Sequence, residues 1–358
     1  MKVLLAIDSF KGTFSSKQVE ERLASRLAQK GIDAVCVPIS DGGEGLLEAL
    51  APAMGGQIVS LVVTGPDGDK VTASYLLSGD VAVVEMAQAA GITLSKLHSA
   101  ADTTTYGVGE IVLDALSRGA TRIYMGLGGS ATCDGGCGMA AALGWVFEDE
   151  DGNAFVPTGR TLSRIARIKR GMSCPIVALS DVTNPLYGAE GAAYVFAPQK
   201  GVKEGDLEAL DLGLYHLAET LVKEEIGYIN VPSAGAAGGL GGMIVALGGK
   251  LDRGIDRVLD LARFDRLVGD CDYVVTGEGR LDSQSLRGKV IDGVLSRKGS
   301  AKALALVGSC LLEDPAFYGL EKVFETNPRH LPFGELTDLK GDMDRAIDEV
   351  VCYMEERV

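Results

Sequence analysis

The feature that most restricts the fold is a glycine-rich stretch between an apolar run and a helical segment. It occupies residues 126–139 and reads GLGGSATCDGGCGM, after the apolar run 122–125 and before the helical pattern of 139–145. Glycines let backbone N–H groups approach a ligand, and the first turn of a helix presents unpaired N–H donors to an anion. The stretch therefore predicts a phosphate-binding loop, although close packing of small residues would also explain its glycines. The candidate ligand-binding residues here are Gly128, Gly129, Ser130, Thr132 and Asp134.

Four more apolar runs end in loops that carry carboxylates. The runs are 3–7, 33–39, 175–179 and 273–275. Ligands bind beyond the carboxyl ends of the strands in open parallel sheets, and Mg²⁺ prefers oxygen ligands. We therefore expect these loops to meet in a single crevice. Their candidate residues are Asp8, Ser9, Lys11, Asp41, Glu44, Asp181, Asn184, Glu278, Gly279, Arg280, Asp282 and Lys289.

The order of strands and helices predicts two domains. Strand–helix alternation at the N-terminus breaks after residues 57–63, where the turn sequence Gly-Pro-Asp-Gly-Asp at 65–69 connects two apolar runs. The alternation resumes near the C-terminus. We therefore expect an α/β fold in which residues 1–65 and 271–358 form a doubly wound parallel-sheet domain and residues 66–270 form a second α/β domain inserted into it. Two domains around a cleft would close on substrate and exclude water.

Composition disfavours several classes of partner and site. The formal net charge of −15 argues against nucleic acid and anionic membranes, which attract basic surfaces. The apolar runs are too short for a signal peptide or a membrane span, so we expect a cytoplasmic protein. The seven cysteines lack C-x-x-C spacing and predict reduced thiols. The three histidines are far apart in sequence, which disfavours a zinc site or a histidine-based triad.

Phosphoryl transfer suits these residues because it requires cations around the phosphates, carboxylates for Mg²⁺ and a base near the attacking hydroxyl. A Walker-type G-x-x-x-x-G-K-[ST] sequence is absent. The candidate cations are Lys11, Lys200, Lys289 and Arg280.

Two other functions stay open at this point. A dinucleotide-dependent oxidoreductase acting on a small hydroxy acid is suggested by Gly126-x-Gly128-x-x-Ala131 after a strand. That fingerprint also expects an acid about 20 residues further on, at the end of the next strand. Here the next strand is predicted only near residue 175. A non-enzymatic sugar-acid-binding protein would explain the glycine loops but not the carboxylates at the strand ends.

Seven segments, in this order, resemble motifs of the type I glycerate kinase family. They are 8–12 (DSFKG), 41–45 (DGGEG), 84–87 (VEMA), 126–139, 181–186 (DVTNPL), 198–201 (PQKG) and 276–289. The resemblance covers almost the whole chain. It implies a flavodoxin-like domain into which a second α/β domain is inserted. It also implies ATP- and Mg²⁺-dependent phosphorylation of D-glycerate to 2-phosphoglycerate, with 3-phosphoglycerate as the less favoured product.

Two positions depart from the family pattern. Cys133 stands where the family usually has Asn, and His98-Ser99-Ala100 replaces an Arg-Asn-Pro-like segment. The second departure removes a cation that could contact a substrate carboxylate.

The placement of the loops suggests a role for each candidate residue. Asp181 is the predicted base for the glycerate hydroxyl because it follows a strand of the inserted domain. Lys11 and Lys289 would steady the transferring phosphoryl group. Asp8, Asp41 and Glu44 would serve metal or substrate, and the remaining candidates would bind substrate or phosphate. We expect ATP and D-glycerate as ligands of a monomer or a small homo-oligomer. The catalytic candidates are Asp181, Lys11, Lys289 and Asp8, and the metal candidates are Asp41 and Glu44.

Overall fold

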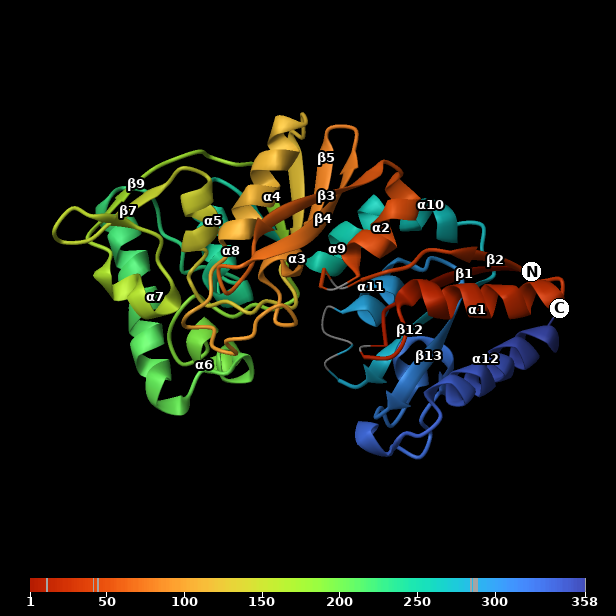
Figure 1. Ribbon diagram of the computed structural model, residues 1–358. Coiled ribbons are helices and arrows are strands. Elements are labelled where there is room, and N and C mark those ends of the chain that lie inside the picture. Colours follow the sequence, from red (N-terminus) through yellow and green to blue (C-terminus); the bar gives the residue numbers. More distant parts are fainter. Residues whose placement is uncertain (11, 41, 44, 284, 286–288, 358) are drawn as a thin grey trace. The chain divides into compact units, whose positions relative to one another are not determined.

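The computed structural model describes residues 1–10, 12–40, 42–43, 45–283, 285 and 289–357 (Figure 1). The chain divides into two compact units, each built from segments that are far apart in the sequence. The first comprises Met1–Asp41, Glu48–Gly55 and Ile255–Val358, and the second comprises Gly42–Leu47 and Gly56–Gly254. No described helix combines the length and apolar character that crossing a membrane requires.

The first unit contains a five-stranded parallel sheet. In space the strands follow the order β14-β13-β12-β1-β2, and every adjacent pair is parallel. Numbered by first appearance along the chain, this is the 2-1-3-4-5 order of flavodoxin-like folds, so the predicted fold class is confirmed. The strands are β1 (Lys2–Ile7), β2 (Asp33–Cys36), β12 (Tyr273–Leu281), β13 (Lys302–Cys310) and β14 (Leu320–Glu325).

The central strand β1 is buried on both faces of this sheet. Val3, Leu5 and Ile7 join a core with α1 (Ser16–Gln29) and α12 (Leu339–Glu355), which lie side by side (Figure 1). The intervening Leu4 and Ala6 are also fully buried. Burial on both faces explains why the run is continuously apolar instead of alternating. The other helices of this part of the chain are α2 (Leu46–Met54), α9 (Gly254–Leu261), α10 (Phe264–Val268) and α11 (Val290–Arg297), with 3₁₀ turns at Pro315–Tyr318 and Phe333–Glu335.

The second unit contains a six-stranded mixed sheet of order β11-β10-β6-β5-β4-β3. The strands from β11 to β5 are parallel, and β4 and β3 are antiparallel to their neighbours. The strands are β3 (Gln57–Thr64), β4 (Lys70–Ser78), β5 (Val81–Glu85), β6 (Arg122–Gly126), β10 (Ile176–Leu179) and β11 (Lys250–Asp252), and a small separate sheet contains β7 (Val146–Glu148), β8 (Ala154–Phe155) and β9 (Arg167–Lys169).

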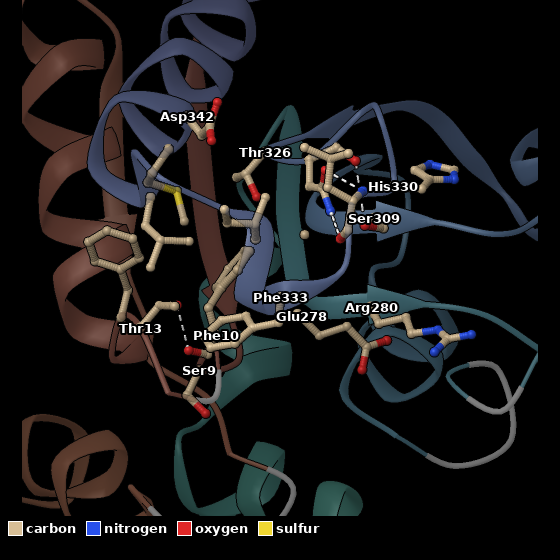
Figure 2. Close-up of a pocket in the computed structure, with 18 of the residues that line it drawn as sticks. Ser9, Phe10, Thr13, Glu278, Arg280, Ser309, Thr326, His330, Phe333 and Asp342 are labelled. Carbon is tan, nitrogen blue, oxygen red and sulfur yellow. Dashed lines mark hydrogen bonds between the residues drawn. The ribbon is translucent and has the colours of Figure 1, made fainter.

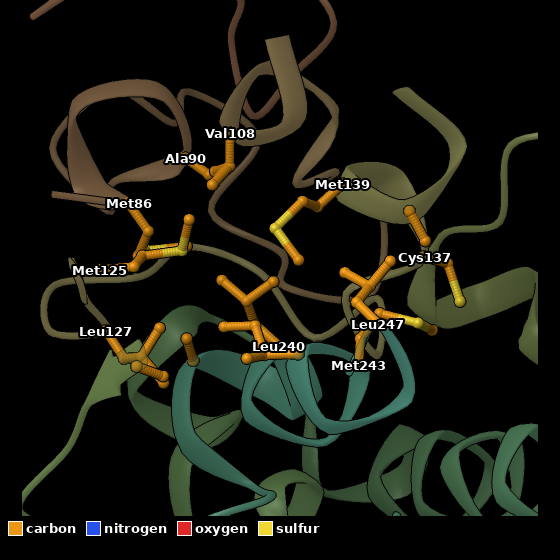
Figure 3. Packing of buried hydrophobic residues seen from close by; sticks show 14 of the residues in the cluster. Met86, Ala90, Val108, Met125, Leu127, Cys137, Met139, Leu240, Met243 and Leu247 are labelled. Carbon is orange, nitrogen blue, oxygen red and sulfur yellow. The ribbon is translucent and has the colours of Figure 1, made fainter. Parts of the chain in front are cut away.

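Helices surround this second sheet. In Figure 3, Leu240, Met243 and Leu247 from the α8 region pack against Met139 of α5 and Met125 of β6. These side chains are fully buried. The helices are α3 (Ala87–Ala90), α4 (Tyr106–Ser117), α5 (Cys137–Ala142), α6 (Ala192–Phe196), α7 (Glu204–Lys223) and α8 (Ala236–Ala246), with 3₁₀ turns at Gly159–Arg164 and Pro198–Lys200.

The boundaries of the two units differ from those predicted from the sequence. Strand β3 pairs along its whole length with β4, so residues 57–64 belong to the second sheet and not to the first. The turn at 65–69 joins two strands of one sheet, and the Gly65 N–H donates to the Asp69 carbonyl at 2.6 Å. At the other boundary, α9 belongs to the first unit, where the side chains of Ile255 and Leu259 lie beside Gly293 of α11.

Candidate active site

A pocket of about 660 Å³ lies at the carboxyl ends of the parallel strands of the first unit (Figure 2). Strand β1 ends at Ile7 and β12 begins only at Tyr273, yet the two strands pair in parallel, so the pocket draws on both ends of the sequence.

 

The strand order reverses direction between β1 and β12, which are paired in parallel with Ile7 opposite Gly277. In doubly wound sheets such a switch point opens a crevice, because the connections from the two adjacent strands leave in opposite directions. Asp8 and Glu278 are the next residues of the two strands at this point. Two of the carboxylates that were predicted to share a crevice, Asp8 and Glu278, therefore lie on adjacent strands of the first unit and line one pocket.

The pocket brings together six of the residues predicted from the sequence. Asp8 and Glu278 are largely buried, at 6% and 8% exposure, and the Ser9 N–H donates to Asp8 Oδ1 at 2.7 Å. Two cations face the same pocket, because Arg280 and Lys289 both line it. The predicted residues that line this pocket are Asp8, Ser9, Glu278, Gly279, Arg280 and Lys289.

Asp282 lies beside this pocket but does not line it. Its backbone N–H donates to Ser285 Oγ at 3.1 Å, and its Oδ1 accepts from the Ser285 N–H at 3.3 Å. Its Oδ2 lies 3.4 Å from Nε of Arg280. Asp282 therefore holds the loop after β12 and orients Arg280.

In the second unit, the glycine-rich stretch forms the loop between β6 and α5. A Cβ atom on Gly128 would lie 2.5 Å from Cα of Gly43, and one on Gly126 would lie 2.3 Å from the Gly42 carbonyl oxygen. Gly129 has a φ of +72°, which disfavours residues with a side chain. Two glycine loops therefore pack backbone against backbone, so close packing accounts for part of the glycine content.

The side chain of Lys200, from the 3₁₀ turn Pro198–Lys200, contacts this loop. Its Nζ donates to Ser130 Oγ at 2.7 Å and to the Thr132 carbonyl at 2.9 Å. Lys200 is only 7% exposed, and this burial lowers the pKa of Lys200 to about 8. Thr132 Oγ1 is buried and has no hydrogen-bond partner among the described residues. Lys200 was a candidate cation from the sequence, but only the structure pairs it with Ser130.

Asp134 is fully buried and bonded within the chain. Its carboxylate accepts from the N–H and the hydroxyl of Thr105, at 2.7 and 2.8 Å, and from the N–H groups of Gly136 and Gly138, at 3.0 and 3.2 Å. Burial raises the pKa of Asp134, and these hydrogen bonds oppose the rise. Asp134 therefore ties the loop to the start of α4, which is a structural contact.

The two departures from the family pattern are neighbours in the structure. The Cys133 N–H donates to the Ala100 carbonyl at 3.0 Å, and the Ala100 N–H donates to the Lys200 carbonyl at 3.2 Å. The His98 backbone lies so close to Gly201 that a Cβ there would be 1.7 Å from the His98 carbonyl oxygen. Both departures therefore lie against the Lys200 turn.

Asp181 and Asn184 follow β10, at the carboxyl edge of the second sheet. Both carboxylate oxygens of Asp181 are shielded from solvent. Asn184 Nδ2 donates to the Glu190 carbonyl at 2.8 Å, and its own carbonyl accepts from the Gly235 N–H at 3.0 Å, so Asn184 shapes this loop.

Glu85 ends β5 at the same edge, opposite Gly126 of β6. It is 4% exposed and accepts from the Leu47 N–H at 2.7 Å and from Gln88 Nε2 at 3.2 Å. Glu85 was not a predicted site residue, although it lies in one of the seven motifs.

Three predicted residues, Lys11, Asp41 and Glu44, lie outside the described part of the chain. Within that part, no cluster of three or more histidine, cysteine, aspartate or glutamate side chains has the arrangement of a metal site.

Several known proteins are similar to this chain over most of its length. Residues 3–354 match the glycerate kinase family. The glycerate 2-kinase of Escherichia coli (strain K12) is 40% identical over 343 residues, which cover 90% of each chain. The glycerate kinase of Bacillus subtilis (strain 168) is 38% identical over 374 residues, covering 99% of this chain and 95% of that one. A crystal structure from Salmonella typhimurium LT2, described as a glycerate kinase 2, has a TM-score of 0.86 at 35% identity and covers 99% of this chain and 98% of its own.

Proposed function

This chain belongs to the glycerate kinase family of ATP-dependent kinases, and we propose that it transfers the γ-phosphoryl group of ATP to the 2-hydroxyl of D-glycerate. The observation that carries the proposal is the pocket at the switch point of the first unit, where Asp8 and Glu278 lie together with Arg280 and Lys289. The name of the Escherichia coli relative, glycerate 2-kinase, supports 2-phosphoglycerate over 3-phosphoglycerate as the product.

The charged residues of the pocket suit a nucleotide phosphate tail. Phosphoryl transfer spreads negative charge over the phosphate oxygens, and cations held beside them stabilise it. We assign this role to Arg280 and Lys289, and Asp282 orients Arg280 through the contact described above. Lys11 stays a predicted contributor.

The same pocket fits a magnesium ion bound together with ATP. Magnesium in kinase sites takes one or two protein carboxylates, and phosphate oxygens and water complete its shell. Asp8 and Glu278 supply two such carboxylates on adjacent strands. A bound Mg²⁺ would neutralise charge on the phosphate oxygens. Asp41 and Glu44 stay predicted metal ligands.

For the acceptor hydroxyl we propose Asp181 as the general base. Asp181 follows β10 at the carboxyl edge of the second sheet, and an aspartate carboxylate within hydrogen-bond reach of a bound hydroxyl can take its proton. Ser130 stays a proposed contact for the anionic end of glycerate or for phosphate, supported by the positive charge of Lys200 at its Oγ. Closure of the domains on substrate, a cytoplasmic location and the oligomeric state stay predictions.

The direct test is a reaction with ATP, Mg²⁺ and D-glycerate, followed by NMR of the product. Carbon–phosphorus coupling assigns the new ester to carbon 2 or carbon 3, and we expect carbon 2. Coupling at carbon 3 would reject the proposed position of transfer. Reduction of NAD by a hydroxy acid without ATP would favour the oxidoreductase, and tight binding of sugar acids without turnover would favour a binding protein.

A further inference from the structure

The pocket of the first unit is larger and more apolar than glycerate requires. Its volume of about 660 Å³ is in the range of pockets that enclose drug-sized ligands, whereas glycerate is a three-carbon acid with a polar group on every carbon. Aromatic and aliphatic side chains form one side of it, from the start of the chain, from the segment before α12 and from the beginning of α12 itself. They are Phe10, Phe14, Phe333, Leu336, Leu339 and Met343.

Phe333 is the most unusual of these side chains. It stands in a short 3₁₀ turn and is 62% exposed, which is costly for a phenyl ring in water. Figure 2 shows its ring turned toward the pocket, near Phe10. An exposed aromatic ring at a pocket is a platform on which a flat base can stack.

The wall of the pocket that carries Phe333, residues 325–333, is fixed by hydrogen bonds before any ligand binds. Asn327 uses both ends of its amide, accepting from the Leu331 N–H at 3.0 Å and donating to the Leu331 carbonyl at 2.9 Å. The His330 ring lies 2.8 Å from Glu325 Oε2, which also accepts from the Cys310 N–H at 2.7 Å. A wall fixed by its own hydrogen bonds loses little conformational entropy on binding.

Asp342 adds a hydrogen-bond acceptor to the apolar side. It lies in the first turn of α12 and lines the pocket, and among the described residues no donor is bonded to its carboxylate. In Figure 2 it lies across the pocket from Arg280. A carboxylate repels phosphates but accepts hydrogen bonds from hydroxyl and amino groups. The pocket therefore has a cationic side for phosphates and an apolar side with an acceptor for a nucleoside.

We infer that this pocket binds the nucleotide: the base stacks on Phe333, Asp342 accepts hydrogen bonds from the nucleoside, and the phosphates face Arg280 and Lys289. The inference rests on the proposed kinase function for the identity of the ligand. It assigns the whole of the nucleotide to the first unit.

Isothermal titration with a non-hydrolysable ATP analogue and, separately, with inorganic tripolyphosphate tests this inference, both with Mg²⁺. Phe333→Ala removes the platform, and because the ring is exposed the variant should fold, which its melting curve checks. We expect the variant to bind the ATP analogue about tenfold more weakly and to bind tripolyphosphate as the wild type does. Asp342→Ala should give the same pattern. The matched control is Phe317→Ala, an 80% exposed phenyl ring that does not line this pocket.

The inference is overturned if Phe333→Ala and the wild type bind the ATP analogue equally, or if the variant loses affinity for tripolyphosphate to the same extent. A raised KM for glycerate with an unchanged KM for ATP would also overturn it, because the pocket would then hold the acceptor. Failure of the proposed function looks different. In that case the wild type binds ATP and Phe333→Ala weakens the binding, but no phosphoglycerate forms.

Discussion

Because Lys200 is buried, we expect the free energy of unfolding of the second unit to rise as the pH increases through the alkaline range. The perturbation that reveals this is Lys200→Met, which keeps the length of the side chain and removes its titrating group. The variant also loses the hydrogen bonds to Ser130 and Thr132. Its stability at a single pH therefore mixes several effects, and only the pH dependence of its difference from the wild type reports on the Lys200 charge.

The sign and size of that difference follow from the lowered pKa of Lys200. Burial lowers it from 10.5 to about 8. Below pH 8 the lysine is protonated in both states, and the folded state bears the cost of a buried charge. Between pH 8 and 10.5 the folded state releases the proton while the unfolded state keeps it, so stability rises with pH. At about 1.4 kcal/mol per pKa unit, the free energy of unfolding of the wild type relative to Lys200→Met should rise by about 2 to 3 kcal/mol between pH 7 and pH 10.

Urea unfolding followed by tryptophan fluorescence is the suitable assay. Trp145 is the only tryptophan of the chain, and it is 3% exposed in the second unit, with its Nε1 donating to the Met172 carbonyl. Its emission therefore reports on the unit that contains Lys200. Lys203→Met, at an exposed lysine three positions further on, is the control and should give no pH-dependent difference. A constant difference between the wild type and Lys200→Met from pH 7 to pH 10 would refute the reasoning.

Three further predictions concern catalysis and packing. Asp181→Asn should lower kcat by at least about a hundredfold with its melting temperature retained, because it removes the proposed base; near-normal turnover would exclude that role. Lys289→Ala should lower kcat/KM for ATP by about tenfold or more through loss of a phosphate contact, and steady-state kinetics with unchanged values would contradict it. Gly238→Ala should destabilise the second unit by at least about 2 kcal/mol in urea unfolding, because Gly238 has a φ of +68° and a Cβ there would lie 2.0 Å from the Thr132 carbonyl oxygen. Gly205→Ala, in α7 with open space around the site in the described structure, is its control and should not destabilise.

Local patterns predicted much of the first unit, but not how its strands pair. The continuous apolar run at 3–7 predicts a strand buried on both faces, and β1 is such a strand. Its neighbour β12 comes from the other end of the chain, and no local signal specifies that pairing. The boundary near residue 65 has a similar cause. The turn at 65–69 is a strong local signal, but a turn of this kind connects strands of one sheet as readily as two domains.

The α8 region shows a second limit of local patterns. Its run of small residues suggests close approach to another backbone, and the structure agrees, since Gly238 lies against Thr132 and Cys133. The pattern does not reveal that Ala237, Gly238 and Gly239 take left-handed backbone conformations inside the helical segment. Contacts with a distant loop impose that geometry, so the sequence of the segment alone cannot predict it.

The strand-end carboxylates show why residue type and spacing were insufficient to assign the site. Asp8, Glu278 and Asp134 all occur in glycine-bearing loops after a strand, and the sequence treats them alike. Asp134 is fully buried and receives four hydrogen bonds from its own chain, whereas Asp8 and Glu278 line a pocket. A carboxylate whose lone pairs are occupied by backbone donors stabilises a loop, and one that faces a cavity can accept an ion or a ligand. The donors that distinguish the two cases come partly from Thr105, which precedes Asp134 by a whole helix and strand. Only the folded chain therefore separates a carboxylate that is bonded within its own chain from one that lines a pocket.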